Sequence, residues 1–165
     1  MLHVVLPVFL GAAIYVLFRS PTLRVFQWLD AAGLGSFVPA ARAWARPIGD
    51  HLPEWLLFSA PDGLWVYGLT ACLALVWRGE PGRARRAWLC VGIALGAGGE
   101  VGQWMGLVPG VFDGADLLLC LAAWGAALVL NLAGDVDEEA GAFGDGRGGV
   151  RRAGAGERGR RLVLR

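Results

Sequence analysis

Four long apolar segments, separated by stretches that carry most of the charge or contain Pro and Gly, constrain this chain most strongly. They cover residues 2–18, 60–77, 88–108 and 115–133. A helix that crosses a bilayer needs about 20 apolar residues, with a range of about 17–25, and each segment is long enough. We therefore predict an all-α integral membrane bundle of four transmembrane helices, formed by residues 1–133.

The composition agrees with a membrane environment. Hydrophobic residues make up 56% of the chain and charged residues 18%, whereas soluble domains carry about 25% charged residues. The net charge of +1 gives no reason to expect a nucleic-acid partner. All fifteen basic residues are Arg. Together with the many Gly, Ala, Val and Leu residues, this indicates a GC-rich bacterial genome, so we predict the bacterial cytoplasmic membrane as the location.

The orientation follows from the placement of Arg. The loop after the second segment packs four of them into nine residues: Arg78, Arg83, Arg85 and Arg86. Because cytoplasmic loops carry an excess of basic residues, this loop and both termini are predicted to be cytoplasmic. Arg19, directly after the first segment, favours the opposite orientation.

The first segment has a second interpretation, as a cleaved signal peptide. It lacks a basic stretch before the apolar run, and no small-x-small cleavage site directly follows that run. We therefore predict a retained span.

Two short helices are predicted in the connection 19–53. Ser20 and Pro21 begin the first as an N-cap and a proline at the first helical position. The second runs from Pro39 through Trp44 and ends before Pro47. Both are expected to lie on the outer membrane surface, where they either cover the bundle or grip a lipid or a partner.

The last part of the chain, residues 134–165, has a different composition. It holds seven Arg and six acidic residues, many Gly and almost no large apolar side chain. Such a segment buries too little apolar surface to offset the entropy of ordering it, so a disordered tail is predicted.

A polar cluster interrupts the apolar sequence where the third segment gives way to the fourth. Four polar residues fall within seventeen positions: Glu100, Gln103, Asp113 and Asp116. Asp62 begins the second segment on the same, outer side. A charge at the centre of a membrane helix costs about 2.5–3.5 kcal/mol on insertion, so such residues are expected to have partners. We predict that the five side chains form a polar binding cluster near the outer leaflet.

Helix capping is an alternative role for part of this cluster. Asp62, Asp113 and Asp116 lie at helix starts, where a carboxylate meets free N–H groups and the positive end of the helix dipole. Glu100 lies inside a helix and has no capping role, so a structural hydrogen bond is its alternative.

Glycines in the third segment are predicted to let a neighbouring helix approach closely. They are Gly92, Gly96, Gly99, Gly102 and Gly106. The same surfaces permit a dimer, so the oligomeric state stays open.

The motifs of common catalytic and metal sites are missing from the sequence. His3 and His51 are far apart, and the three Cys lie in separate apolar runs without a CxxC pair. There is no GxSxG, HExxH or GxxxxGK[ST] pattern. We predict no metal and no cofactor.

The polar cluster resembles that of small bacterial membrane proteins of the VanZ-like family. There, an E-x-x-Q motif precedes a Pro/Gly turn and an Asp opens the last helix, as Glu100, Gln103, Pro109-Gly110 and Asp116 do here. The sequence departs from that pattern at Gly63, Trp65 and Cys120. The run 61–65 together with this motif also resembles uncharacterised small multi-pass membrane proteins of bacteria. The VanZ-like resemblance implies four or more helices and a link to the cell envelope; the family takes its name from glycopeptide resistance.

Three functions fit these residues. The first is binding of a polar group of a membrane lipid, an envelope precursor or a partner helix. The second is an intramembrane enzyme that acts on a lipid-linked substrate, with Glu100 as general acid or base. The third is passage of ions or protons.

Overall fold

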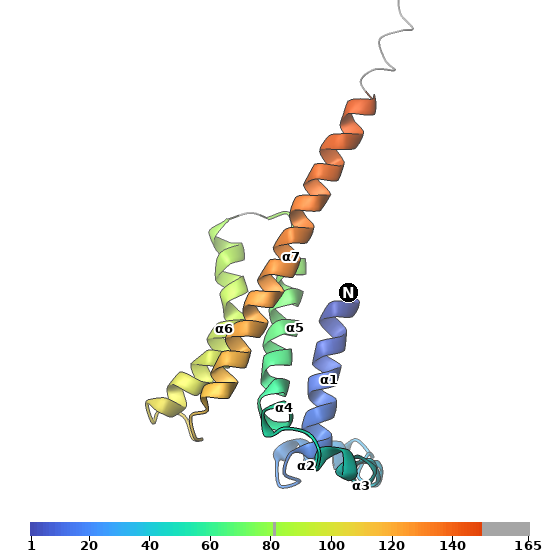
Figure 1. Ribbon diagram of the computed structural model, residues 1–165, viewed down its shortest axis with the longest axis vertical. Coiled ribbons are helices and arrows are strands. Elements are labelled where there is room, and N and C mark those ends of the chain that lie inside the picture. The colour runs from blue at the N-terminus through green and yellow to red at the C-terminus, as the bar shows by residue number, and fades with distance from the viewer. Residues whose placement is uncertain (81, 150–165) are drawn as a thin grey trace, which may run out of the picture. The chain divides into compact units, whose positions relative to one another are not determined.

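The computed structural model describes the backbone of residues 1–80 and 82–149, and the side chains of residues 1–80 and 82–131. Throughout this part of the chain the regular elements are helices, which confirms the all-α prediction (Figure 1). They are α1 (Leu2–Phe18), α2 (Arg24–Ala31), α3 (Phe37–Gly49), α4 (Glu54–Phe58), α5 (Ala60–Val76), α6 (Arg83–Trp104) and α7 (Gly114–Gly149). The chain divides into two units, Met1–Asn131 and Leu132–Arg165. The candidate site lies in the first.

The helices α1 and α5 pack against each other through glycine. A Cβ atom on Gly68 would lie 2.5 Å from Val8 Cγ2, and one on Gly11 would lie 2.8 Å from Trp65 Nε1. Trp65 also donates a hydrogen bond of 3.3 Å from Nε1 to the carbonyl oxygen of Val8. Small residues at both contacts allow the two backbones to approach closely, which is the usual way in which membrane helices associate.

The other face of α5 contacts α6 and α7. A Cβ atom on Gly63 would lie 3.3 Å from the carbonyl oxygen of Leu119 in α7. Trp124 of α7 donates a hydrogen bond of 2.8 Å to the carbonyl oxygen of Leu89 in α6. The fully buried residues here are small: Thr70, Ala71, Cys120 and Ala127. The helices are therefore joined by close backbone approach and not by a core of large apolar side chains.

The long helices coincide closely with the predicted apolar segments, although α6 is displaced toward the N-terminus. It ends at Trp104 because Gly106 adopts φ +71°. The N–H groups of Leu107 and Gly106 donate to the carbonyl oxygens of Gly102 (2.8 Å) and Gln103 (3.0 Å). This is a Schellman C-cap, which needs a residue that tolerates positive φ.

Only one helix in the described residues is long and apolar enough to cross a membrane by length and composition. It is the part of α7 from Gly114 to Asn131. The helices α1 and α5 are apolar but have 17 residues each. The helical part of the prediction is therefore confirmed, whereas the four membrane crossings stay a prediction.

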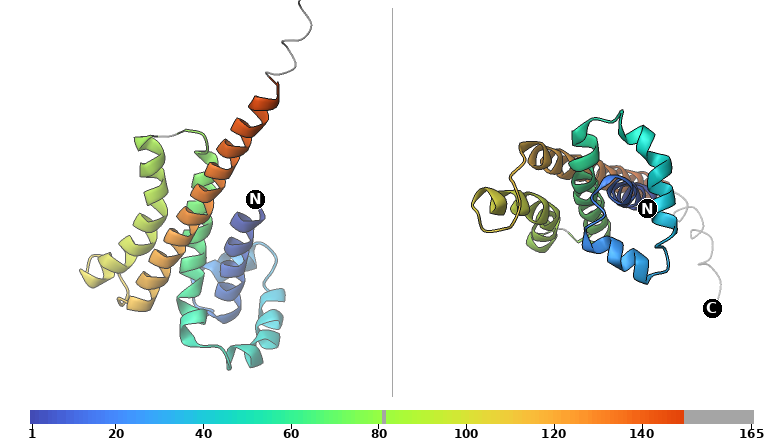
Figure 2. Two further views of the ribbon diagram at one scale, coloured as in Figure 1. Left: turned by 45° about the horizontal axis from the view of Figure 1, so that its top comes forward. Right: turned by 90° about the horizontal axis from the view of Figure 1, so that it is seen from below.

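The connection 19–53 holds two helices, α2 and α3, as predicted, and a third, α4, follows it at Glu54–Phe58. They gather at the C-terminal end of α1 (Figures 1 and 2). The helix α2 begins at Arg24 and not after Ser20, whose hydroxyl bonds Thr22 Oγ1 at 2.9 Å instead of capping a helix. The helix α3 continues past Pro47 to Gly49. A proline in the last turn removes only one hydrogen bond, so it need not end the helix before itself.

The disorder predicted for residues 134–165 stays a prediction, although the bounds of α7, Gly114–Gly149, include the first part of this segment. The rest of the predicted tail, residues 150–165, lies outside the described residues.

Candidate functional site

Three helices contribute an acidic side chain to one pocket of about 310 Å³. The acidic residues are Asp62 of α5, Glu100 of α6 and Asp116 of α7. Seven further residues line it: Trp65, Val66, Leu69, Gly92, Leu95, Gly96 and Cys120. Most of these are apolar or small, so the carboxylates supply the chemistry of the pocket. Three of the five residues in the predicted polar cluster therefore meet here.

Asp62 is the carboxylate with a nearby positive charge. Its Oδ2 lies 3.9 Å from Nη2 of Arg19, and both side chains are partly exposed. Arg19 also donates a hydrogen bond of 2.7 Å from Nη2 to the carbonyl oxygen of Phe58. Its guanidinium carbon lies 5.5 Å from the ring centre of Tyr15, a cation–π distance. Arg19 is thus fixed at the end of α1, where it offsets one of the three negative charges.

Glu100 is buried, with 9% of its surface exposed. Its Oε2 accepts a hydrogen bond of 2.9 Å from the backbone N–H of Asp113, thirteen residues later. This bond ties the start of α7 to α6 across the intervening turn. The structural hydrogen bond considered for Glu100 is therefore present, and the same side chain also lines the pocket.

Asp116 lies in the first turn of α7. Its Oδ1 is buried and has no hydrogen-bond partner among the described residues. A buried polar atom without a partner costs about 1–3 kcal/mol, so it needs an explanation. A donor group of a bound molecule would provide one.

Gln103 and Asp113 do not line the pocket. Asp113 caps α7: its Oδ1 accepts a hydrogen bond of 2.8 Å from the N–H of Ala115, the second residue of the helix. Gln103 packs under the turn before α7, where a Cβ atom on Gly110 would lie 2.6 Å from Gln103 Nε2. Gly110 has φ +141°, so this position suits glycine for two reasons. The five residues of the predicted polar cluster therefore lie in two places: three line the pocket, and Gln103 and Asp113 lie at the turn before α7.

The five glycines named for helix packing have different surroundings. Gly92 faces Thr70, and Gly96 faces Val66 and Cys120, so both lie at contacts with neighbouring helices. A Cβ atom on Gly99 would meet no atom of a neighbouring helix within 4 Å. The two remaining glycines serve the end of α6: Gly102 packs against Val108, and Gly106 forms the C-cap. A contact with a neighbouring helix is therefore present at Gly92 and Gly96, and none lies within 4 Å of the Cβ positions of Gly99, Gly102 and Gly106.

Two residues of the site were missed by the sequence patterns. Arg19 entered only as a charge that bears on orientation, yet it is the cation beside Asp62. Cys120 entered as a departure from a family pattern, yet its buried side chain lines the pocket. The one available signal was the position of Arg19 immediately after an apolar helix, because in a bundle of helices of similar length such a residue lies at the level of the other helix ends.

The pocket is rich in hydrogen-bond acceptors and poor in donors. Three carboxylates line it, and one guanidinium lies at its edge. In the described part of the chain, no group of three His, Cys, Asp or Glu side chains is placed to hold a metal ion. The arrangement suits a group that donates several hydrogen bonds, such as an amine or a set of hydroxyls.

Comparisons with protein-family profiles, with curated proteins and with solved structures found no match for this chain. A function for the chain therefore has to be inferred from the geometry of the site.

Proposed function

We propose that this chain is a multi-pass protein of the bacterial cytoplasmic membrane. In this proposal the pocket of Asp62, Glu100 and Asp116 binds a donor-rich polar group, either of a lipid or envelope precursor or of a partner helix. The observation that carries it is the buried Asp116 Oδ1, which faces no donor among the described residues in a pocket that two other carboxylates share.

The membrane location is supported by the apolar side chains that the helices expose. On α1, these include Leu2, Leu6, Phe9 and Leu10; on α6 and α7, they include Leu95, Val101, Leu118, Val129 and Leu130. In water such a surface would favour aggregation, whereas acyl chains cover it without cost. At ~1.5 Å per residue, a 17-residue helix such as α1 or α5 spans about 26 Å, close to the thickness of a thin hydrocarbon core.

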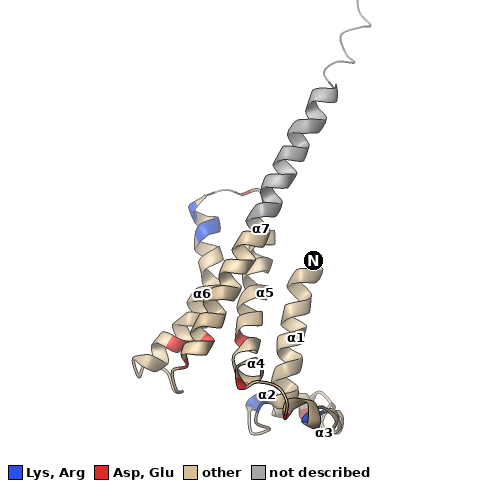
Figure 3. Cartoon of the chain, in the orientation of Figure 1, with Lys and Arg blue, Asp and Glu red and all other residues tan. Residues whose placement is uncertain are grey.

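The orientation is supported by the placement of charge along α6. The basic start of α6 lies at the opposite end of that helix from the acidic stretches of α5, α6 and α7, whereas the basic residues of α2 and α3 lie at the acidic end (Figure 3). With the basic end in the cytoplasm, the pocket lies near the outer leaflet and both termini are cytoplasmic.

A catalytic role for Glu100 has less support. Its Oε2 already accepts a backbone hydrogen bond that holds the turn in place. This hydrogen bond explains why a carboxylate is buried here, so a catalytic role is not needed to account for Glu100. The VanZ-like resemblance supports a link to the cell envelope, and we retain it as part of the proposal without deriving a reaction from it.

The experiment is native mass spectrometry of the full chain in nanodiscs made from bacterial lipid extract. We expect wild type to retain an amine-bearing or hydroxyl-rich molecule that Asp116→Asn loses. Asn keeps the shape of the side chain but replaces one acceptor oxygen with a donor. Glu80→Gln is the matched control, because Glu80 is exposed in the loop before α6. Equal retention by wild type, Asp116→Asn and the control would contradict binding at this pocket.

A further inference from the structure

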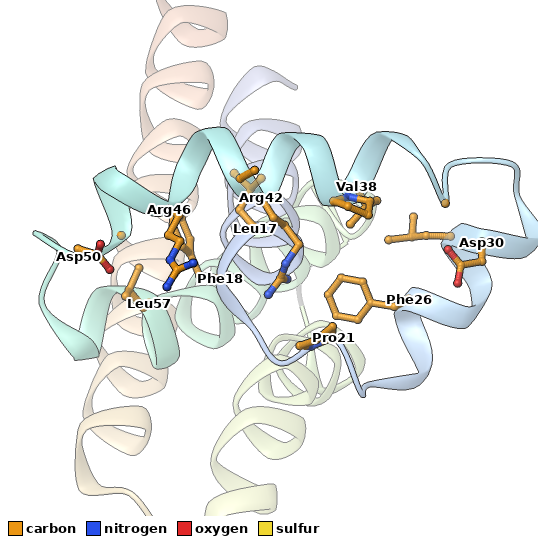
Figure 4. A pocket seen from close by; sticks show the side chains of 15 residues that line it. Leu17, Phe18, Pro21, Phe26, Asp30, Val38, Arg42, Arg46, Asp50 and Leu57 are labelled. Carbon is orange, nitrogen blue, oxygen red and sulfur yellow. The ribbon is translucent and has the colours of Figure 1, made fainter.

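A second and larger pocket, of about 740 Å³, lies between α3, α2 and the end of α1. Figure 4 shows its lining from close by. Leu17, Phe18, Phe26, Val38 and Leu57 give it apolar walls. It shares no lining residue with the acidic pocket.

Two arginines of α3 line this second pocket. Arg42 and Arg46 are four residues apart and therefore lie on the same face of the helix. In Figure 4 both side chains point from α3 into the pocket. Two guanidinium groups beside apolar walls give the pocket one basic part and one apolar part.

Arg42 is held in place by contacts with the protein. Its Nη1 donates a hydrogen bond of 2.7 Å to the carbonyl oxygen of Val16, near the end of α1. Its guanidinium carbon lies 5.1 Å from the ring centre of Phe26. A guanidinium has five N–H donors, so this arrangement fixes the group while leaving donors for a ligand.

The acidic residues of the pocket form no ion pair with these arginines. Asp30 and Asp50 lie toward its two ends (Figure 4). Among the described residues, no ion pair joins either carboxylate to Arg42 or Arg46. Arg46 is exposed, and its charge is available to an anion at the pocket mouth.

We infer that this pocket binds the headgroup of an anionic phospholipid. Arg42 and Arg46 contact the phosphate, because guanidinium groups match the geometry of phosphate oxygens. The apolar walls formed by Leu17, Phe18 and Phe26 receive the first part of an acyl chain. This inference shares the membrane location with the proposed function but depends on different residues, so either can fail without the other.

The test uses the full chain in phosphatidylcholine nanodiscs that contain a minority of phosphatidylglycerol. We expect native mass spectrometry to find phosphatidylglycerol retained by wild type and by Arg24→Gln. Arg24 is an exposed arginine of α2 that does not line the pocket, so its variant removes the same charge elsewhere. Arg46→Gln should bind about tenfold more weakly, as expected from the loss of one charge-assisted contact.

The outcomes separate the possible ligands. Equal retention by wild type, Arg46→Gln and Arg24→Gln would overturn the inference, as would equal retention of phosphatidylcholine. Displacement of the lipid by soluble glycerol phosphate at millimolar concentration would show a site for a free phosphate, which also overturns it. Asp116→Asn should retain phosphatidylglycerol as wild type does, which distinguishes this site from the acidic pocket. Arg42→Gln is a weaker test, because Arg42 also supports the end of α1.

Discussion

The buried carboxylate of Glu100 has two roles, because it holds the turn before α7 and also lines the acidic pocket. The Oε2 of Glu100 accepts the Asp113 N–H, and the Asp113 side chain then caps the helix that follows. Two hydrogen bonds in series therefore fix where α7 begins. Asp116, three residues after Asp113, takes its position from the same arrangement. The acidic pocket depends on this turn even though Asp113 itself does not line it.

Replacing Glu100 tests this dependence. Glu100→Ala leaves the Asp113 N–H without its acceptor, and we expect a loss of about 1–3 kcal/mol in the free energy of unfolding. Glu100→Gln keeps an amide oxygen that can accept the same bond, so most of the stability should remain. The measurement is the Tm of each variant in the same nanodiscs. Equal Tm values for the Ala and Gln variants would show that the hydrogen bond contributes little.

The conformation of the turn before α7 also depends on a single residue, Gly110. Gly110→Ala places a Cβ atom 2.6 Å from Gln103 Nε2 at φ +141°, a backbone conformation that costs about 1–3 kcal/mol for other residues. We expect a lower Tm and less fully folded protein on purification. Gly114→Ala is the matched control, because Gly114 begins α7 and no atom lies within 4 Å of its Cβ position. If Gly114→Ala lowers the Tm as much as Gly110→Ala does, strain at Gly110 does not explain the loss of stability.

At the scale of elements, the role of a glycine depends on whether its face of the helix contacts another helix. The helix α6 has Gly96 against Val66 and Cys120, while Gly99 has open space. Both positions lie in one apolar segment and look alike in sequence. Their different surroundings arise from how α5 and α7 cross α6, and the spacing of the glycines carries no information on that crossing.

This difference gives a prediction within one helix. Gly96→Ala would place a Cβ atom 2.5 Å from Val66 Cγ2 and 3.1 Å from Cys120 Sγ, and overpacking of this kind costs about 1–3 kcal/mol. Gly99→Ala meets no neighbour and should gain about 1 kcal/mol from the higher helix propensity of alanine. We therefore expect Gly96→Ala to lower the Tm of thermal unfolding and Gly99→Ala to raise it. A shift in the same direction would mean that α5, α6 and α7 pack differently from the arrangement in this structure.

The apolar pattern predicted the long helices well and the short ones poorly. The bounds of α1 and α5 lie within a residue of the predicted segments, because a charged residue or a proline marks where such an apolar helix can begin or end. The helix α4 and the start of α2 were missed, since short helices depend on tertiary contacts that local sequence does not encode. In the candidate site, Asp62 and Asp116 line one pocket, whereas Gln103 packs against Gly110 in the turn before α7, a contact that the spacing of the residues does not reveal.

At the scale of the whole molecule, the number of membrane crossings depends most on α6. It has 22 residues but begins with Arg83, Arg85 and Arg86 and carries Glu100 near its end. Unlike the Gly114–Asn131 part of α7, α6 is not long and apolar enough to cross a membrane by length and composition alone. If the three arginines lie at the cytoplasmic surface and Glu100 is satisfied by Asp113, the apolar stretch between them is free to cross.

Cysteine labelling on either side of α6 tests this directly. Glu80 precedes the helix and Val111, which is 88% exposed, follows it. In a background of Cys72→Ala and Cys90→Ala, we expect Val111→Cys to react with a membrane-impermeant maleimide on intact spheroplasts. Glu80→Cys should react only after permeabilisation, because the positive-inside rule places its loop in the cytoplasm. The retained Cys120 is buried and serves as the unreactive control. Since α6 is the one helix between the two positions, labelling from the same side would show that α6 does not cross, and the reverse pattern would place the acidic pocket near the inner leaflet.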